Sequence, residues 1–157
     1  MGPHLREQQP GAVCLGAQYG GQAKLAGLLA SEKNQPKILE APLTVIIGND
    51  IGFADALPQL MPHNTQATQK AFAAPGVPEV TAMRNGSLQG AYLIIAARAL
   101  GLDCGPMSGF DNASVDRAFF TGTRIQSNFI CSIGYGNPDS VFLRNPRLIF
   151  EEAGHFA

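Results

Sequence analysis

The segment from about Glu79 to Leu100 constrains the fold of this chain more than any other part of the sequence. Its apolar residues recur at helical spacing and occupy nearly every side of the helix in its second half. A helix that is apolar almost all round has to be buried, either centrally in a domain or against another subunit. Gly86 and Gly90 inside it each lower helix stability by about 1 kcal/mol relative to Ala. They therefore predict a close approach by another helix or by a ligand, and Gly101 is expected to end the helix.

The composition is typical of a folded domain that has a buried subunit interface. The chain has 157 residues, which fits one domain, and 15% of them are charged while 45% are hydrophobic. These proportions exclude a disordered chain, and they leave little polar surface for a monomer. The net charge of −1 gives no electrostatic signal for nucleic acid or for an anionic membrane. We therefore expect neither of these as a partner.

Neither a metal site nor a membrane segment is predicted. The three Cys and three His residues form none of the spacings typical of zinc sites. The longest unbroken apolar run covers residues 91–97, far short of the roughly 20 residues that a membrane span needs. The N-terminus also lacks the basic-then-apolar order of a signal peptide. We expect a cytoplasmic protein without a bound metal.

Short elements that surround the long helix predict an α/β or α+β fold. The expected elements are a helix over residues 22–34, a strand over 43–47, a short helix over 53–61, a long mobile loop over 62–78, a short extended piece with a glycine-rich turn over 102–111, a short helix to about residue 120, and a strand over 127–135. The uncharged, β-branched run at 43–47 is typical of a strand that is covered on both faces.

General catalytic motifs do not identify a reaction. The chain contains no Walker A motif, no GxGxxG and no GxSxG, and no pair of carboxylates lies in a recognisable acid/base setting. Gly134-Tyr135-Gly136 after a strand is a weak dinucleotide signal, and a plain turn at the end of a strand is the favoured interpretation. We therefore predict no catalytic side chain from these patterns.

Several segments in series are more informative. They are LPQLMPH at residues 57–63, RNGSLQGAYLIIAARALGLDCGPMSGFD at 84–111, and then AFFTG, SNFICSIGYG and LRNPRLIFEE. In this order and spacing they resemble the nitroreductase family of FMN-dependent oxidoreductases, in particular its malonic semialdehyde reductase branch. The resemblance covers roughly residues 24–153. It implies a mixed sheet flanked by helices and an intertwined homodimer, with FMN at the dimer interface and each site drawing on both chains.

The resemblance also implies which residues contact the flavin ring. The turn Pro106-Met107-Ser108-Gly109 matches the family segment that runs along the ring, where backbone N–H groups face the reactive ring nitrogen. A reduced flavin nitrogen needs a fixed donor, and Gly permits the close approach of the backbone. The alternative interpretation is a turn that only caps a helix.

Basic residues near the C-terminus are implied as phosphate contacts. Arg144 falls where the family places a basic residue on the FMN phosphate, and Arg147 is a second candidate. A guanidinium suits a phosphate because its planar fork donates two parallel hydrogen bonds. The alternative is that both are solvated arginines. Arg84 and Asn85 lie near the expected cleft without an assigned role.

The implied reaction needs no catalytic triad, because the cofactor carries the chemistry. NADH or NADPH delivers hydride to FMN, and a small-molecule substrate then takes hydride in the same pocket. The substrate would be a small aldehyde such as malonic semialdehyde, which gives 3-hydroxypropionate, or a nitro or quinone compound. Two alternatives stay open: an inactive truncated remnant that dimerises but binds flavin weakly or not at all, and a small-ligand binding module unrelated to flavin.

Residues 1–23 depart from the family pattern and read like no secondary-structure element. Back-translated and read one nucleotide later, they can spell WGPTSANSSPARFVWVRSTEAK, which resembles the family's own segment with its Ser-Ala-Asn flavin contact and first strand. We interpret 1–23 as a non-native, out-of-frame segment and 24–157 as a partial FMN-binding domain. The N-terminal helices and the first strand of the family would then be missing.

Overall fold

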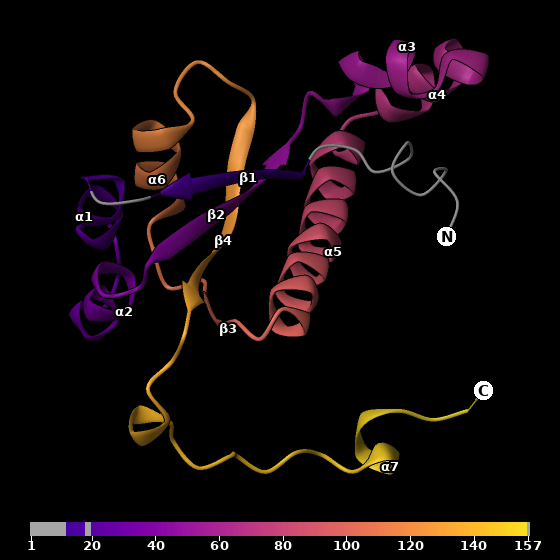
Figure 1. The fold of residues 1–157 in the computed structure, drawn as a ribbon. Coiled ribbons are helices and arrows are strands. Elements are labelled where there is room, and N and C mark those ends of the chain that lie inside the picture. Colours follow the sequence, from indigo (N-terminus) through magenta and orange to yellow (C-terminus); the bar gives the residue numbers. More distant parts are fainter. Residues whose placement is uncertain (1–11, 18–19, 157) are drawn as a thin grey trace.

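The computed structural model describes residues 12–17 and 20–156, and its centre is a four-stranded sheet (Figure 1). The strands lie in the order β1-β2-β4-β3, with bounds β1 Ala12–Ala17, β2 Leu43–Asp50, β4 Ile125–Gly134 and β3 Asp103–Met107. Every neighbouring pair runs antiparallel, so the sheet of the described chain is not the mixed sheet that the resemblance implied. β2 and β4 confirm the two predicted strands.

Helices surround this sheet, and most of them are short. In chain order they are α1 (Gly20–Ala26), α2 (Gln35–Leu39), α3 (Leu57–Leu60), α4 (Thr65–Phe72), α5 (Val77–Ala99), α6 (Asn112–Phe119) and α7 (Phe150–Ala153), with short 3₁₀ turns at residues 32–34, 53–56, 62–64 and 138–140. The α/β class is therefore confirmed. Among the described residues, no helix has both the length and the hydropathy that crossing a bilayer requires.

The two faces of the sheet are covered by different helices (Figure 1). Ile46 of β2 faces α1, α2 and α6, whereas Val45 and Ile47 on either side of it face α5, as strand alternation requires. The core on the first face comprises Leu25, Ala26, Ile38, Ile46, Phe110, Val115, Phe120 and Ile130, and the core on the second face comprises Val45, Ile47, Ala97, Cys131 and Ile133. β2 is thus covered on both sides, as predicted.

The glycines inside α5 allow the sheet to approach the helix closely. A Cβ at Gly86 would lie 2.2 Å from Oδ1 of Asn49 in β2, and one at Gly90 would lie 2.4 Å from the ring of Phe129 in β4. The predicted close approach is confirmed, but the expected partner, another helix or a ligand, was wrong: within one chain the partner is the sheet. Gly101 has a φ of 80° just after the helix, which is the left-handed conformation typical of a glycine that ends a helix.

Three sequence predictions need correction. The first concerns residues 1–23, for which no strand was expected: Ala12–Ala17 form β1, which pairs antiparallel with β2. The backbone of β2 would otherwise have an unpaired edge, and pairing along that edge satisfies its N–H and C=O groups. That this segment is read out of frame stays a prediction.

The second and third corrections concern α1 and the predicted mobile loop. α1 ends at Ala26 instead of reaching Asn34, because the chain turns at Gly27. Residues 62–78 are not a structureless loop: they contain α4, whose Phe72 packs edge-to-face on Phe53 with 4.9 Å between ring centroids. Tertiary packing of this ring stabilises a helix that the sequence period did not indicate.

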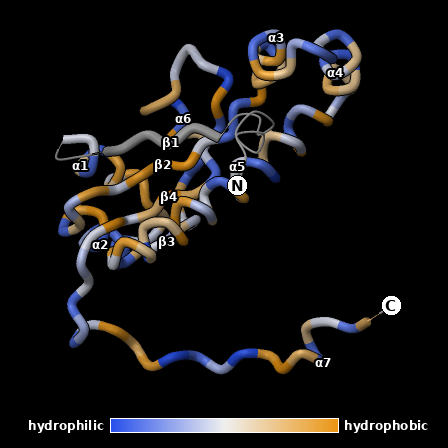
Figure 2. Tube along the Cα trace, turned by 45° about the vertical axis from the view of Figure 1, so that its right-hand side comes forward, coloured by the Kyte–Doolittle hydropathy of each residue, from blue (hydrophilic) through white to orange (hydrophobic). Residues whose placement is uncertain are grey.

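The chain beyond the sheet forms a C-terminal arm, residues 137–156, that extends away from the domain (Figure 2). Its apolar side chains are exposed, including Phe142 at 91% and Leu143 at 95%. Within the described residues, hydrogen bonds in the arm join positions no more than four apart. In the part of one chain that the structure describes, the large apolar side chains of the arm are thus left exposed, although Phe150 and Phe156 contact each other.

Candidate functional site

Residues 106–109, the 106–109 turn, lie where the edge strand β3 ends. Met107 is half-buried and packs on the core beneath α1 and α6, whereas Pro106, Ser108 and Gly109 are exposed. The loop after α1 fixes the turn from the other side, because the Ala30 N–H donates to the Gly109 carbonyl at 3.0 Å. The turn is therefore held in place at both ends and open to solvent between them.

The turn presents two backbone donors and free space. Among the described residues, no hydrogen bond leads from the N–H groups of Ser108 or Gly109 to another residue. A Cβ built at Gly109 would meet no atom within 4 Å. Two adjacent donors next to an open surface are an arrangement that an acceptor on a flat ligand can use.

Asp111 places a carboxylate two residues after the turn. The hydroxyl of Ser114 donates to the Asp111 carboxylate, and this hydrogen bond is the main reason that the pKa of Asp111 lies below its usual range. Asp111 is thus charged at the beginning of α6, where the helix dipole favours an anion.

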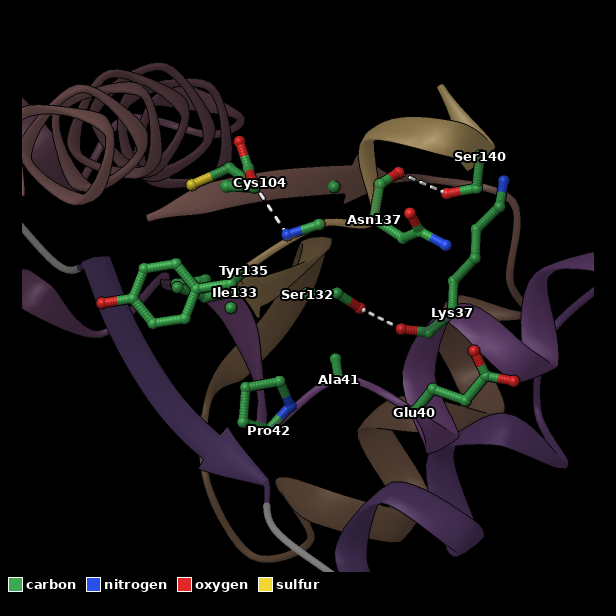
Figure 3. Close-up of a pocket in the computed structure, with 14 residues that line it drawn as sticks. Lys37, Glu40, Ala41, Pro42, Cys104, Ser132, Ile133, Tyr135, Asn137 and Ser140 are labelled. Carbon is green, nitrogen blue, oxygen red and sulfur yellow. Dashed lines mark hydrogen bonds between the residues drawn. The ribbon is translucent and has the colours of Figure 1, made fainter. Parts of the chain in front are cut away.

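A cavity of about 420 Å³ lies along the first half of β3 (Figure 3). Its lining residues come from the end of α2, the start of β3, the end of β4 and the first turn of the C-terminal arm: Lys37, Glu40, Ala41, Pro42, Asp103, Cys104, Gly105, Ser132, Ile133, Gly134, Tyr135, Gly136, Asn137 and Ser140. Gly105 directly precedes the 106–109 turn, so the cavity and the turn adjoin each other along β3.

Lys37 gives this cavity a cation that the sequence analysis did not single out. Its ammonium donates to Oδ1 of Asn34 at 2.9 Å, and its carbonyl accepts from the Ser132 hydroxyl at 2.9 Å. The second bond ties α2 to β4. The only cue in the sequence was a lysine shortly before a buried strand, which is too common a pattern to identify a site.

Arg144 and Arg147 lie on the C-terminal arm, and both are exposed. Among the residues that the structure describes, Arg147 donates only to the neighbouring carbonyls of Asn145 and Pro146. Ser140 lines the same cavity as Gly105, and four extended residues from Ser140 to Arg144 span at most about 14 Å. The structure thus brings the arm to the cavity beside the turn, but it does not bring either arginine into contact with the turn.

Arg84 and Asn85 lie in the first half of α5. Asn85 donates to the Thr81 carbonyl of its own helix at 2.9 Å, and Arg84 is exposed. The surroundings of these two residues do not indicate a ligand. Beside them runs an exposed apolar stripe, the α5 stripe, which consists of Val80, Met83, Leu88, Tyr92 and Ile95. The predicted burial of the helix is therefore satisfied on one side only within a single chain.

Comparison with known proteins identifies the fold family. The chain matches the nitroreductase family over residues 4–135, most of its length. It belongs to the nitroreductase family. It is 52% identical over 156 residues to HadB of Ralstonia pickettii, named as an NADH dehydrogenase/NAD(P)H nitroreductase, with 98% of this chain and 79% of that protein covered. A Caulobacter vibrioides protein with the same enzyme name is 58% identical over 153 residues, covering 98% of this chain and 77% of that protein.

Solved nitroreductase structures share the fold at low sequence identity. A nitroreductase from Exiguobacterium sibiricum, solved in complex with FMN, superposes with a TM-score of 0.81 at 20% identity and covers 94% of this chain and 77% of its own. The Bacillus subtilis protein ydfN superposes with a TM-score of 0.80 at 16% identity, and the match covers 97% of this chain and 80% of ydfN. The family predicted from the motifs is confirmed, and so is its fold.

Proposed function

We propose that this nitroreductase is an FMN-dependent NAD(P)H oxidoreductase. The observation that carries the proposal is the 106–109 turn, where the N–H groups of Ser108 and Gly109 have no partner among the described residues. The open space beside Gly109 fits a flat ring lying against the backbone, because a side chain there would occupy that space. The FMN bound by the Exiguobacterium relative and the NAD(P)H in the names of the closer relatives support the same cofactors here.

The roles of the protein groups follow from their chemistry. When bound, FMN would supply hydride transfer from NADH or NADPH to the substrate. The N–H groups of Ser108 and Gly109 would hold the acceptor atom of the ring, and Pro106 and Met107 would lie along its edge. Arg144, with Arg147 near it, would donate to the phosphate. Lys37 stands in the adjoining cavity, where an ammonium would favour an anionic or carbonyl group of the ligand.

We further propose that the protein is a homodimer. The α5 stripe and the apolar side chains of the C-terminal arm are exposed in one chain, and exposed apolar surface of this extent favours an interface. A second copy would cover both surfaces and exclude water from the cofactor. As substrate we propose a small aldehyde such as malonic semialdehyde, which the order and spacing of the sequence motifs support.

The test of the cofactor site uses two glycines. Gly109 and Gly20 both have open space at the Cβ position, so Gly109→Val and Gly20→Val should each leave the fold intact. With FMN added to the purified protein, we expect Gly109→Val to weaken flavin binding at least about tenfold, because the side chain takes the space of the ring. Gly20→Val should bind FMN as the wild type does.

Quenching of flavin fluorescence gives the affinity, and oxidation of NADH or NADPH in the presence of an aldehyde gives the activity. A wild-type protein that leaves FMN fluorescence unchanged would overturn the proposed cofactor. Equal FMN affinity in the two variants would show that flavin binds elsewhere.

A further inference from the structure

Asp103, the first residue of β3, connects three parts of the chain. Its carboxylate accepts a hydrogen bond from the Gly136 N–H at 2.8 Å and pairs with the guanidinium of Arg98 near the end of α5. A Cβ at Gly136 would lie 3.1 Å from Oδ2 of Asp103, so the glycine allows this close contact. Asp103 and Gly136 both line the cavity beside the 106–109 turn.

The bond to Gly136 lies at the point where the C-terminal arm leaves the domain. β4 ends at Gly134, and within the described residues every hydrogen bond beyond Gly136 is local to the arm. The Asp103–Gly136 bond is therefore the last hydrogen bond that fixes the arm to the rest of the described chain. This bond therefore influences the direction of the chain after Gly136.

The two contacts of Asp103 differ in how much they contribute to the local structure. Arg98 and Asp103 are both more than half exposed, and exposed ion pairs contribute little because solvent screens them. The bond to Gly136 fixes a backbone atom. The Gly136 N–H, followed by Arg98, lowers the pKa of Asp103, so the carboxylate stays charged and remains an acceptor at neutral pH.

We propose that Asp103 is a positioning residue for the cofactor: by holding Gly136 it sets the course of the C-terminal arm and so delivers Arg144 to the phosphate. This inference rests on the proposed function for the role of Arg144. Asp103 touches neither substrate nor cofactor, and it acts through the arm. Asn137 and Ser140, which line the cavity just beyond Gly136, would be placed by the same bond.

A double-mutant cycle tests the inference. Asp103→Ala and Arg144→Gln are made singly and together, and the FMN affinity of each purified protein is measured by fluorescence quenching. We expect Asp103→Ala to weaken binding about tenfold in the wild-type background, as loss of a hydrogen bond to a charged group does. In the Arg144→Gln background it should change the affinity less than about twofold, because the residue through which it acts is gone.

A purely structural role predicts the opposite pattern. Equal weakening in both backgrounds, or no weakening in the wild-type background, overturns the inference. Asp139→Ala is the matched control, since it removes an exposed carboxylate from the arm without touching Gly136, and it should bind FMN like the wild type. Arg98→Gln should also have a small effect, because it removes the exposed ion pair and an exposed hydrogen bond to the Leu102 carbonyl but leaves the bond to Gly136 in place. If Asp103→Ala does not fold, Asp103→Leu, which has a similar shape but no acceptor for the Gly136 N–H, replaces it in the cycle.

A second measurement does not depend on flavin. Without FMN, trypsin should cut after Arg144 and Arg147 several times faster in the Asp103 variants than in the wild type, whereas cleavage after Arg124 in the domain should not change. Unchanged cleavage of the arm overturns the anchoring role of Asp103. Absence of FMN binding by the wild type, with faster cleavage of the arm, would instead show that the anchor exists and that the proposed function is wrong.

Discussion

At the scale of single residues, Cys104 and Cys131 should react very differently. Cys131 is fully buried in β4, and burial, followed by the neighbouring Cys104, raises the pKa of its thiol to about 11. At pH 8 only about a thousandth of such a thiol is thiolate, against about a quarter of an ordinary one. We expect iodoacetamide to label Cys104 at least about a hundredfold faster than Cys131, measured by mass spectrometry of the tryptic peptides.

The pH dependence of this labelling has a definite sign. Because the folded-state pKa lies above the ordinary value, the labelling rate of Cys131 should rise about tenfold per pH unit until about pH 11. In the unfolded chain the Cys131 thiol has its ordinary pKa and loses its proton at lower pH than in the folded protein. The free energy of unfolding should therefore fall between about pH 9 and 11. Equal labelling of the two thiols at pH 8 would contradict the burial of Cys131.

Gly86 gives a second prediction at this scale. In an open helix, Gly→Ala would stabilise by about 1 kcal/mol. Here a Cβ would displace Oδ1 of Asn49, which accepts from Asn128 at 3.1 Å and is almost fully buried. We expect Gly86→Ala to lower the free energy of unfolding by about 1–2 kcal/mol in urea titrations. A gain in stability would show that the helix does not lie against β2.

At the scale of elements, the α5 stripe predicts the oligomeric state. Tyr92 is 64% exposed and Ile95 63% exposed in the single chain. Ile95→Lys would put an ammonium into the proposed apolar interface, which we expect to weaken dimerisation at least about a hundredfold. Sedimentation of the wild type, of Ile95→Lys and of the exposed control Lys33→Glu measures this. A wild type that sediments as a monomer would exclude the homodimer.

The elements also show what the sequence could and could not predict. β2 was predictable because Val45, Ile46 and Ile47 form a β-branched run without charge. β4 was predictable because Phe129, Ile130 and Ile133 give the apolar pattern of a core strand. α4 was not, because it depends on Phe72 meeting Phe53 across a turn, and a period within one segment carries no such information. The 106–109 turn was predicted by motif resemblance, whereas the cavity beside it depends on four elements that only the fold brings together.

At the scale of the whole molecule, the origin of residues 1–23 should affect how firmly FMN is held. We expect the nucleotide sequence of the gene, read one nucleotide later, to spell WGPTSANSSPARFVWVRSTEAK. A version with this frame restored gains the Ser-Ala-Asn contact that the resemblance places on the flavin. It should keep FMN through gel filtration and show the visible flavin spectrum, whereas the chain as written should bind FMN only when the flavin is supplied. A gene whose codons, read one nucleotide later, cannot encode this sequence would contradict the out-of-frame hypothesis.

The assembled molecule also decides which chain supplies each part of a site. Ser140 lines the cavity beside Gly105 of its own chain, and Arg144 follows within about 14 Å, so we expect the turn and the arginine of one site to come from the same chain. Mixed dimers of Gly109→Val and Arg144→Gln test this, because every site then carries one defect if both parts come from one chain. We expect the mixture, unfolded and refolded together, to bind no more FMN than the separate variants. If the arginine came from the partner, one site of each mixed dimer would be intact, and about a quarter of the wild-type capacity would return.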